Sequence, residues 1–575
     1  MVTMIRKSTC LLFLAVSGIT LGLFAQEPSH YNWGPFTRAD SLRGYLSSVR
    51  TCYDVTYYHL DVTVNPDSGY IQGSNTIAFN VDSSFGKMQV DLFANMNIDS
   101  IKFEDGTFLK YSREFAAVVI YMPKILEKGS NHQIVFYYSG KPLVAVKPPW
   151  DGGFIWKKDK QGNPWVMVTC QGTGASVWWP NKDHQSDEPD SMLLSITVPK
   201  GLEDISNGRL RSKVDLPDGK TQYNWFIGCP INNYNVTVNV GKYAHFSDTY
   251  KNSDGSKLTL DYYVMPENLR KARKQFAEVK TMLACYEKYF GKYPFYQDGY
   301  KLIESSHNGM ENQSAVAYGN HYQLGYEGRA SSAAGLKFDF IILHESAHEW
   351  WGNNVTSKDI ADMWIHESFG AYSEALYVEY NWGHKAALKY INAKKQNVRN
   401  NEPIIGPYNV NHEGAKDMYD KGQLVLNTLR DVIGNDELWF SILKGLQEKY
   451  VYKTVDADVI INYINQRTKT DLNYFFEQYL RNPTIPQLTV EITKKADSTA
   501  LRYMWKADVK DFRMPIKVTT SKDHFTFIYP TMEWQTMKLK NFDPKDFRVD
   551  EDEFYCTVKI NRYYFDPKSS LKLYD

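Results

Sequence analysis

The chain has 575 residues and equal numbers of basic and acidic side chains, 66 of each. This balance argues against nucleic acid or an anionic membrane surface as a partner. At this length we expect about three or four domains.

The first 25 residues have the pattern of a secretory signal peptide. Arg6 and Lys7 precede an apolar run over residues 10–25, which is short for a membrane span and ends in small residues. We expect cleavage after Ala25 and an exported protein, periplasmic or extracellular, with no integral membrane segment left. An uncleaved anchor is the alternative. Residues 26–50 form an N-terminal extension.

Residues 51–245 alternate apolar and polar side chains between turn signals, as in Asp61-Val-Thr-Val64 before Pro66-Asp-Ser-Gly69. This period of two predicts a β-rich domain. Helical patterns begin at Glu267 and continue to about residue 482, so we expect a mainly helical domain over residues 246–485. Strand patterns return from Gln487, which predicts a small β-sandwich over residues 486–575. The expected fold is therefore multidomain α+β.

Five cysteines follow the leader, widely spaced and odd in number: Cys52, Cys170, Cys229, Cys285 and Cys556. In an exported protein they allow one or two disulfides, and at least one thiol stays free. None is predicted to bind a metal.

The segment His344-Glu-Ser-Ala-His348 lies in a predicted helix over residues 336–351. Side chains at positions i and i+4 lie on one helix face, so both imidazoles can bind one zinc ion. Glu345 lies about 100° around the helix and is placed to take a proton from water.

A second helix is predicted from Asp362, as its N-cap, to Tyr380. Its Glu367 is the expected third zinc ligand, which leaves the fourth position open for water, as in catalytic sites with one zinc per chain. Glu374, two turns later, could orient a ligating histidine. His366 is predicted to be structural or to face the substrate, and not to bind the metal.

Several motifs around this site, in order, resemble those of the zinc aminopeptidases of the aminopeptidase N and leukotriene hydrolase group. Met310-Glu311-Asn312, preceded by Asn308-Gly309, is similar to the family's Gly-Ala-Met-Glu-Asn motif. Trp364-Ile-His-Glu367 is similar to its Trp-Leu-Asn-Glu, and Tyr419-Asp-Lys-Gly422 to its catalytic tyrosine segment. The resemblance covers about residues 50–575.

The resemblance implies a thermolysin-like catalytic domain that removes the N-terminal residue of peptides. Glu311 would hold the substrate's α-ammonium group and Gln171 would assist it. Tyr419 would stabilise the oxyanion, and Glu345 would be the general base. Gly309, Met310 and Asn312 would line the substrate site, with zinc bound by His344, His348 and Glu367.

The resemblance also leaves alternatives open. The family often adds a large helical C-terminal domain, which this sequence does not include, so we expect a more open site that accepts longer peptides. The same scaffold could serve another zinc hydrolase, such as an endopeptidase or an epoxide hydrolase, or a catalytically silent binding protein. The sequence does not indicate the preferred N-terminal residue or the oligomeric state.

Overall fold

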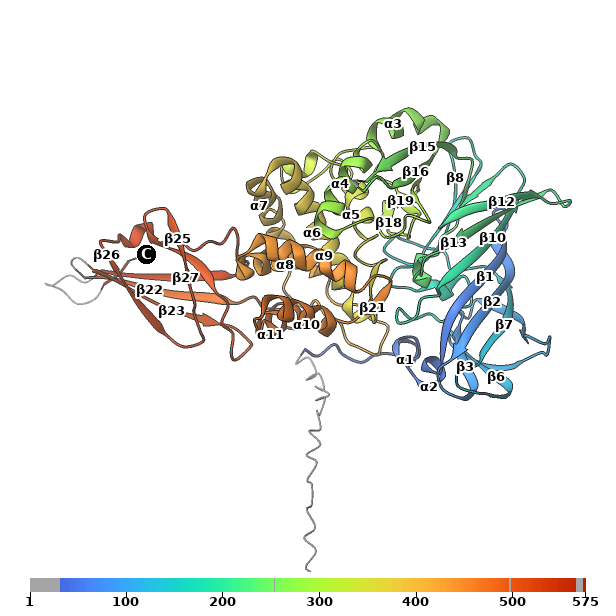
Figure 1. Ribbon diagram of the computed structural model, residues 1–575, viewed down its shortest axis with the longest axis horizontal. Helices are drawn as coiled ribbons and strands as arrows, with labels where there is room; N and C mark the ends of the chain where they lie inside the picture. Colours follow the sequence, from blue (N-terminus) through green and yellow to red (C-terminus); the bar gives the residue numbers. More distant parts are fainter. Residues whose placement is uncertain (1–30, 253, 496–497, 565–571, 575) are drawn as a thin grey trace, which may run out of the picture.

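The computed structural model describes residues 31–252, 254–495, 498–564 and 572–574, and the predicted leader lies outside these ranges. Along its long axis the molecule has a β-rich end, a helical middle and a smaller β-rich end (Figure 1). The multidomain α+β fold predicted from the sequence is confirmed.

The N-terminal part is built on a seven-stranded sheet with the order β12-β13-β10-β1-β2-β7-β4. Its strands are β1 (Tyr53–Asn65), β2 (Tyr70–Val81), β4 (Met96–Phe103), β7 (Asn131–Gly140), β10 (Ser191–Pro199), β12 (Arg209–Asp215) and β13 (Lys220–Ile227). Along β2 and β13 buried residues alternate with more exposed ones, which is the period of two read in the sequence.

Two smaller sheets complete this part, with the orders β3-β6-β5 and β11-β14-β9-β8. Their strands are β3 (Phe85–Asp91), β5 (Lys110–Glu114), β6 (Ala117–Leu126), β8 (Gly153–Lys158), β9 (Pro164–Thr169), β11 (Glu203–Ile205) and β14 (Asn239–Gly241). Two segments of this layer reach the helical part: the turn after β9, which carries Gln171, and the short 3-10 helix Asn233–Asn235.

A five-stranded sheet, in the order β15-β16-β17-β19-β18, lies against the first helices of the middle part. Its strands are β15 (Ala244–Lys251), β16 (Lys257–Val264), β17 (Tyr300–Glu304), β18 (Gly309–Met310) and β19 (Val316–Tyr318). The edge strand β18 contains part of the motif predicted to line the substrate site. Its pairing with β19 fixes the backbone of that motif.

The helical middle is organised around the long helix α6, which contacts α4, α5, α7 and α8. The helices are α3 (Leu269–Gln275), α4 (Glu278–Phe290), α5 (Phe340–Ala347), α6 (Trp364–Trp382), α7 (His384–Asn392), α8 (Asp420–Ile433), α9 (Asp436–Lys449), α10 (Ala457–Thr468) and α11 (Asn473–Phe476). The strands β20 (Val355–Ser357) and β21 (Lys453–Val455) form a parallel pair beside them.

Two helix predictions were wrong at their ends. The helix expected over residues 336–351 is only α5, because the Asp339 carboxylate accepts hydrogen bonds from Ile341 N and Ile342 N, at 3.1 and 3.4 Å, and caps the helix there. Asp362 does not cap α6. Its carboxylate instead accepts from Tyr408 Oη and Ala457 N, both at 3.0 Å, and α6 begins at Trp364 without a side-chain cap.

The C-terminal part has a five-stranded sheet in the order β26-β23-β22-β27-β28 and the separate hairpin β24-β25. Its strands are β22 (Gln487–Lys495), β23 (Ser498–Lys506), β24 (Ile516–Ser521), β25 (His524–Ile528), β26 (Gln535–Lys540), β27 (Thr557–Tyr564) and β28 (Lys572–Tyr574). One hydrophobic core runs from the helices into this part, so the two pack as a continuous body.

The N-terminal extension forms the short helices α1 (Arg38–Gly44) and α2 (Ser48–Thr51). The Trp33 and Phe36 rings meet the His412 ring edge-on, with centroids 5.4 and 5.5 Å apart. Asn411 N donates to Asp40 O at 3.1 Å. The extension therefore joins the N-terminal part to a loop that precedes α8.

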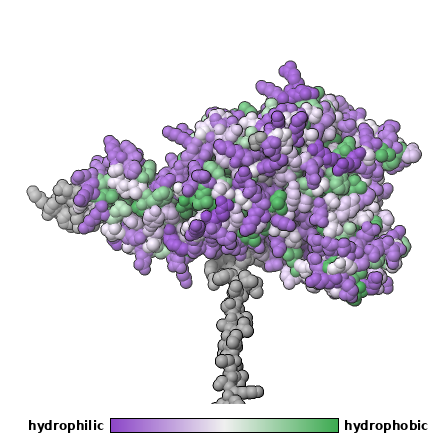
Figure 2. All heavy atoms as spheres, viewed as in Figure 1, coloured by the Kyte–Doolittle hydropathy of each residue, from purple (hydrophilic) through white to green (hydrophobic). Residues whose placement is uncertain are grey.

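The visible face is mostly hydrophilic, with apolar residues in small scattered groups (Figure 2). Within the described ranges, no helix combines the length and apolar character needed to cross a membrane. The five cysteines there are all buried and free, so the disulfides that the sequence allowed do not form.

Candidate zinc centre and active site

Helices α5 and α6 bring two imidazoles and one carboxylate together. His344 Nε2 and His348 Nε2 are 3.4 Å apart, and each lies 3.5 Å from Glu367 Oε2. Ligands about 2.0–2.2 Å from a tetrahedral zinc ion lie roughly 3.3–3.6 Å from one another. The spacing of these three atoms therefore fits a zinc ion.

The surroundings of the three ligands fit a metal as well. Glu367 Oε2 is buried and has no hydrogen-bond partner among the described residues, an arrangement that is costly unless a cation binds there. Each histidine uses its other nitrogen elsewhere: His344 Nδ1 donates to Glu374 Oε1 at 2.8 Å, and His348 Nδ1 to Trp351 O at 2.9 Å. These bonds fix the tautomers that leave both Nε2 atoms free to bind zinc.

The local backbone explains how the ligands reach this position. His344 and His348 are one turn apart at the end of α5, where His348 is already the C-cap. Gly370 on α6 faces them, and a Cβ there would lie 3.0 Å from His348 Cε1. The small residue lets α6 approach α5 closely, which places Glu367 beside the two imidazoles.

The charges of the ligands oppose the effect of burial. Burial alone raises the pKa of the Glu367 carboxyl, but the two adjacent histidines outweigh it and hold this pKa well below its usual range. Glu367 is therefore an anion, as a zinc ligand must be.

Glu345 lies on the same helix with its carboxylate against β18. A Cβ on Gly309 would lie 2.4 Å from Glu345 Oε1, so the glycine leaves space for this side chain. Burial raises the pKa of the Glu345 carboxyl to about 7. The glycine that we expected to run beside the substrate thus also accommodates the predicted general base.

Glu311 follows β18 and is almost fully buried, with 2% of its surface exposed. Its backbone oxygen accepts from Asn353 Nδ2 at 2.9 Å, and its side-chain Oε1 accepts from Tyr234 Oη at 3.2 Å. Burial raises its pKa, and His348 acts in the opposite direction. The neighbours Met310 and Asn312 are buried too.

Gln171 comes from the N-terminal part and reaches the metal centre directly. Its Nε2 donates to Glu367 Oε1 at 2.8 Å. Asn411 Nδ2 donates to the next carbonyl along the turn, Gly172 O, at 3.3 Å. These two bonds link the Gln171 turn to the helical part on both sides of the site.

Tyr419 stands on the other side of His344. The two rings are stacked, with centroids 5.9 Å apart and planes at 28°. Burial raises the pKa of the Tyr419 phenol well above its usual value, and the negative charge of Glu367 adds to this effect. The phenol therefore keeps its proton and is able to donate a hydrogen bond.

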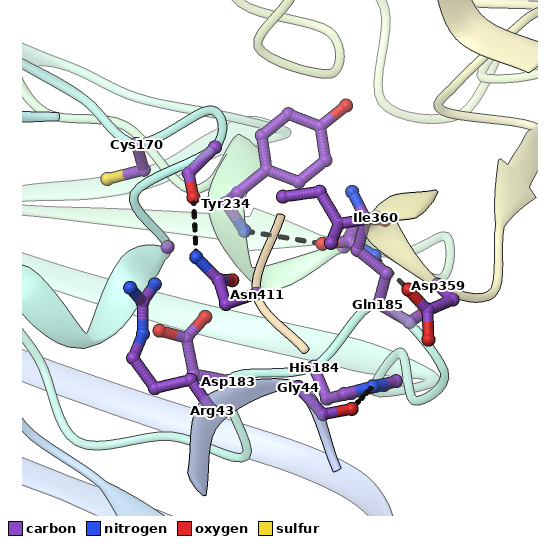
Figure 3. A pocket seen from close by; sticks show the side chains of 13 residues that line it. Arg43, Gly44, Cys170, Asp183, His184, Gln185, Tyr234, Asp359, Ile360 and Asn411 are labelled. Atoms are coloured by element: carbon purple, nitrogen blue, oxygen red, sulfur yellow. Dashed lines mark hydrogen bonds between the residues drawn. The ribbon is translucent and has the colours of Figure 1, made fainter. Parts of the chain in front are cut away.

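Three residues of the site were not predicted from the sequence. Tyr390 Oη donates to Glu374 Oε2, and the Phe340 ring stacks on His344 with centroids 5.2 Å apart. Tyr234 lies beside a small cavity under the Gln171 turn, and its phenol points away from Arg43 and Asp183 (Figure 3). In a chain with 41 tyrosines, no local signal distinguishes Tyr234 or Tyr390.

His366 does not bind the metal centre. Its Nε2 accepts from Ser357 N at 2.9 Å, and its Nδ1 lies 3.4 Å from Tyr234 Oη. Burial lowers its pKa to about 3.

Residues 275–479 match the model of the peptidase family M1 domain. The chain belongs to the M1 peptidase family. The matched residues include the whole zinc triad, so the His344, His348 and Glu367 site is the zinc site of an M1 peptidase.

Curated relatives and solved structures agree with this assignment. Endoplasmic reticulum aminopeptidase 1 of Mus musculus is 24% identical over 67% of this chain and 41% of its own length. Leucyl aminopeptidase of Saccharolobus solfataricus is 24% identical over 59% of this chain and 44% of its own. The chain thus spans about two fifths of the length of these relatives.

Among solved structures, an M1 zinc metallopeptidase from Deinococcus radiodurans, bound to a Tyr-Ser-Ala substrate, has a TM-score of 0.63 and 17% identity. The alignment covers 76% of this chain and 95% of that one. At this identity the likeness concerns the fold.

Proposed function

We propose that this M1 peptidase is a zinc aminopeptidase, which hydrolyses the peptide bond after a free N-terminal residue. The observation that carries the proposal is Glu311, a carboxylate with 2% exposure, together with the zinc triad and Glu345. A buried carboxylate needs a cation or several donors. The α-ammonium group of a peptide is a cation that only an exopeptidase has to recognise.

The residues of this chain divide the work as follows. His344, His348 and Glu367 would hold zinc, which acts as a Lewis acid on a carbonyl and lowers the pKa of water. Glu345 takes a proton from the attacking water and passes it to the leaving amine. Tyr419 donates to the oxygen that becomes negative, and Glu311 fixes the position of the ammonium group.

Gln171 supports the same arrangement from the N-terminal part. Its bond to Glu367 Oε1 restrains the third zinc ligand. Its amide oxygen is left as an acceptor for an ammonium group. A peptide with a free N-terminus would thus lie between the Gln171 turn and β18.

Export remains part of the proposal. The pattern of residues 1–25 supports a periplasmic or extracellular location, and peptides with a free N-terminus would be the substrates there.

The test is a panel of aminoacyl fluorogenic substrates, each paired with its N-acetylated form, with and without a zinc chelator. We expect the free-amine substrates to be cleaved only when zinc is present, and the N-acetylated forms to be left intact. Glu345→Gln should abolish the activity and leave zinc bound. Cleavage of the N-acetylated substrates at a comparable rate would contradict the proposal and favour an endopeptidase.

A further inference from the structure

A buried chain of hydrogen bonds ends on Glu311. Tyr234 Oη lies 3.2 Å from Glu311 Oε1 and 3.4 Å from His366 Nδ1, and Ser357 N lies 2.9 Å from His366 Nε2. Tyr234, His366 and Ser357 are 5%, 0% and 0% exposed. The links join three separate elements: a short 3-10 helix of the N-terminal part, α6 and β20.

The donors and acceptors fix the direction of every bond. A backbone N–H only donates, so His366 Nε2 accepts from Ser357 and carries no proton. The one proton of the neutral imidazole is then on Nδ1, which donates to the Tyr234 oxygen. The Tyr234 hydroxyl in turn donates to Glu311 Oε1. All three bonds therefore point towards the carboxylate.

This arrangement restricts Glu311 in a way that its own backbone does not. A glutamate side chain has several rotamers of similar energy, and a donor at a fixed place favours one of them. The donor is itself held, because the His366 ring lies against the Tyr234 ring with planes at 21°. His366 directly precedes the zinc ligand Glu367, so the same helix turn supports the metal and this chain.

We propose that Tyr234 and His366 are positioning residues, which aim Glu311 at the α-ammonium group of the substrate. The inference rests on the proposed aminopeptidase function. It assigns a role to the N-terminal part: Tyr234 positions the amine site, as Gln171 restrains the zinc ligand.

The test compares two inhibitors that differ only in the amine. Leucine hydroxamate carries the α-ammonium group, and 4-methylpentanohydroxamate lacks it, while both bind zinc through the same hydroxamate. In Tyr234→Phe we expect the inhibition constant of leucine hydroxamate to rise about tenfold, the usual effect of losing one hydrogen bond to a charged group. The constant of 4-methylpentanohydroxamate should stay within about twofold.

Substrate kinetics provide a second readout. For a leucyl fluorogenic substrate, Tyr234→Phe should raise KM by about the same factor and leave kcat within about threefold. Tyr377→Phe is the matched control, because it removes another buried phenol–carboxylate bond, to Glu278 Oε1 at 3.0 Å, and leaves the Glu311 chain intact. It should change neither inhibition constant.

A double-mutant cycle tests the link through His366. His366→Gln alone should raise the inhibition constant of leucine hydroxamate about threefold, and should add little once Tyr234 is already phenylalanine. Independent, additive effects would overturn the role of His366.

Two further outcomes would overturn the whole inference: an unchanged constant for leucine hydroxamate in Tyr234→Phe, or an equal loss for both inhibitors, which indicates a disturbed zinc centre. If the wild-type enzyme bound both hydroxamates equally and cleaved no aminoacyl substrate, the aminopeptidase proposal itself would fail. If the wild-type enzyme preferred the amine and Tyr234→Phe kept that preference, only the positioning role would fail.

Discussion

Replacement of Glu374 by alanine should weaken zinc binding, although this residue does not bind zinc. Glu374 Oε1 accepts from His344 Nδ1 at 2.8 Å, and Oε2 accepts from Tyr390 Oη. The residue is 1% exposed. Its removal leaves two buried donors without a partner and lets the imidazole of a zinc ligand rotate.

The expected size follows from these contacts. Loss of the partner of a zinc-binding histidine typically lowers metal affinity 10- to 100-fold, or about 1.4–2.7 kcal/mol. Because Glu374→Ala removes both bonds, we expect about 100-fold. Glu374→Gln keeps an uncharged acceptor for His344 and should cost about tenfold. Tyr390→Phe removes only the outer bond and should cost a few-fold.

The assay is competition for zinc with a fluorescent chelator, followed by activity at saturating zinc. Glu304→Ala is the control: Glu304 is also buried and accepts from a tyrosine, Tyr322, at 2.7 Å, but it is not bonded to a zinc ligand. It should lower stability without changing zinc affinity. A zinc Kd for Glu374→Ala within twofold of wild type would refute the reasoning.

Three other predictions concern the oxyanion donor, the metal and a buried carboxyl. Tyr419→Phe should lower kcat about 10²–10³-fold with little change in KM, because the lost donor acts on the transition state, and a parallel rise in KM would count against that role. A chelator should lower the free energy of unfolding by about 4 kcal/mol, relative to free zinc at 1,000 times its Kd, and denaturant titration measures this. Burial raises the pKa of Asp204 to about 8, so the fold prefers the protonated acid while the unfolded chain ionises near pH 4. Wild-type stability should therefore fall by about 1.4 kcal/mol per pH unit between about pH 4 and 8, relative to Asp204→Asn, and equal pH slopes for the two proteins would contradict the assignment.

The sequence predicts those parts of the fold that depend on local periodicity. The alternation along β2 and β13 and the helical spacing of His344 and His348 are visible within a few residues. The helix ends were not predicted correctly, because they depend on tertiary partners. Asp362 has the composition of a cap, but Tyr408 and Ala457 take its carboxylate.

The same distinction applies to the site. His344, Glu345 and His348 lie within one helix turn of one another, and Glu367 needs only the return of the next helix. Gln171 and Tyr234, in contrast, are 196 and 77 residues from the glutamates they contact, Glu367 and Glu311. Gln171 was predicted only through a family resemblance. Tyr234 had neither a resemblance nor a local pattern to indicate it.

The free thiols make the different parts of the molecule separately observable. Cys170 lies in the N-terminal part, Cys285 on α4 and Cys556 beside the C-terminal sheet, and all are buried. Burial raises the pKa of the Cys556 thiol to about 12 and also raises that of the other two, so little reactive thiolate forms in the fold. Each thiol reacts only after its own surroundings open, so the labelling rate at each cysteine reports the opening of one part of the chain. Since no described cysteine forms a disulfide, these rates are measurable in reducing buffer without changing the covalent structure of those parts.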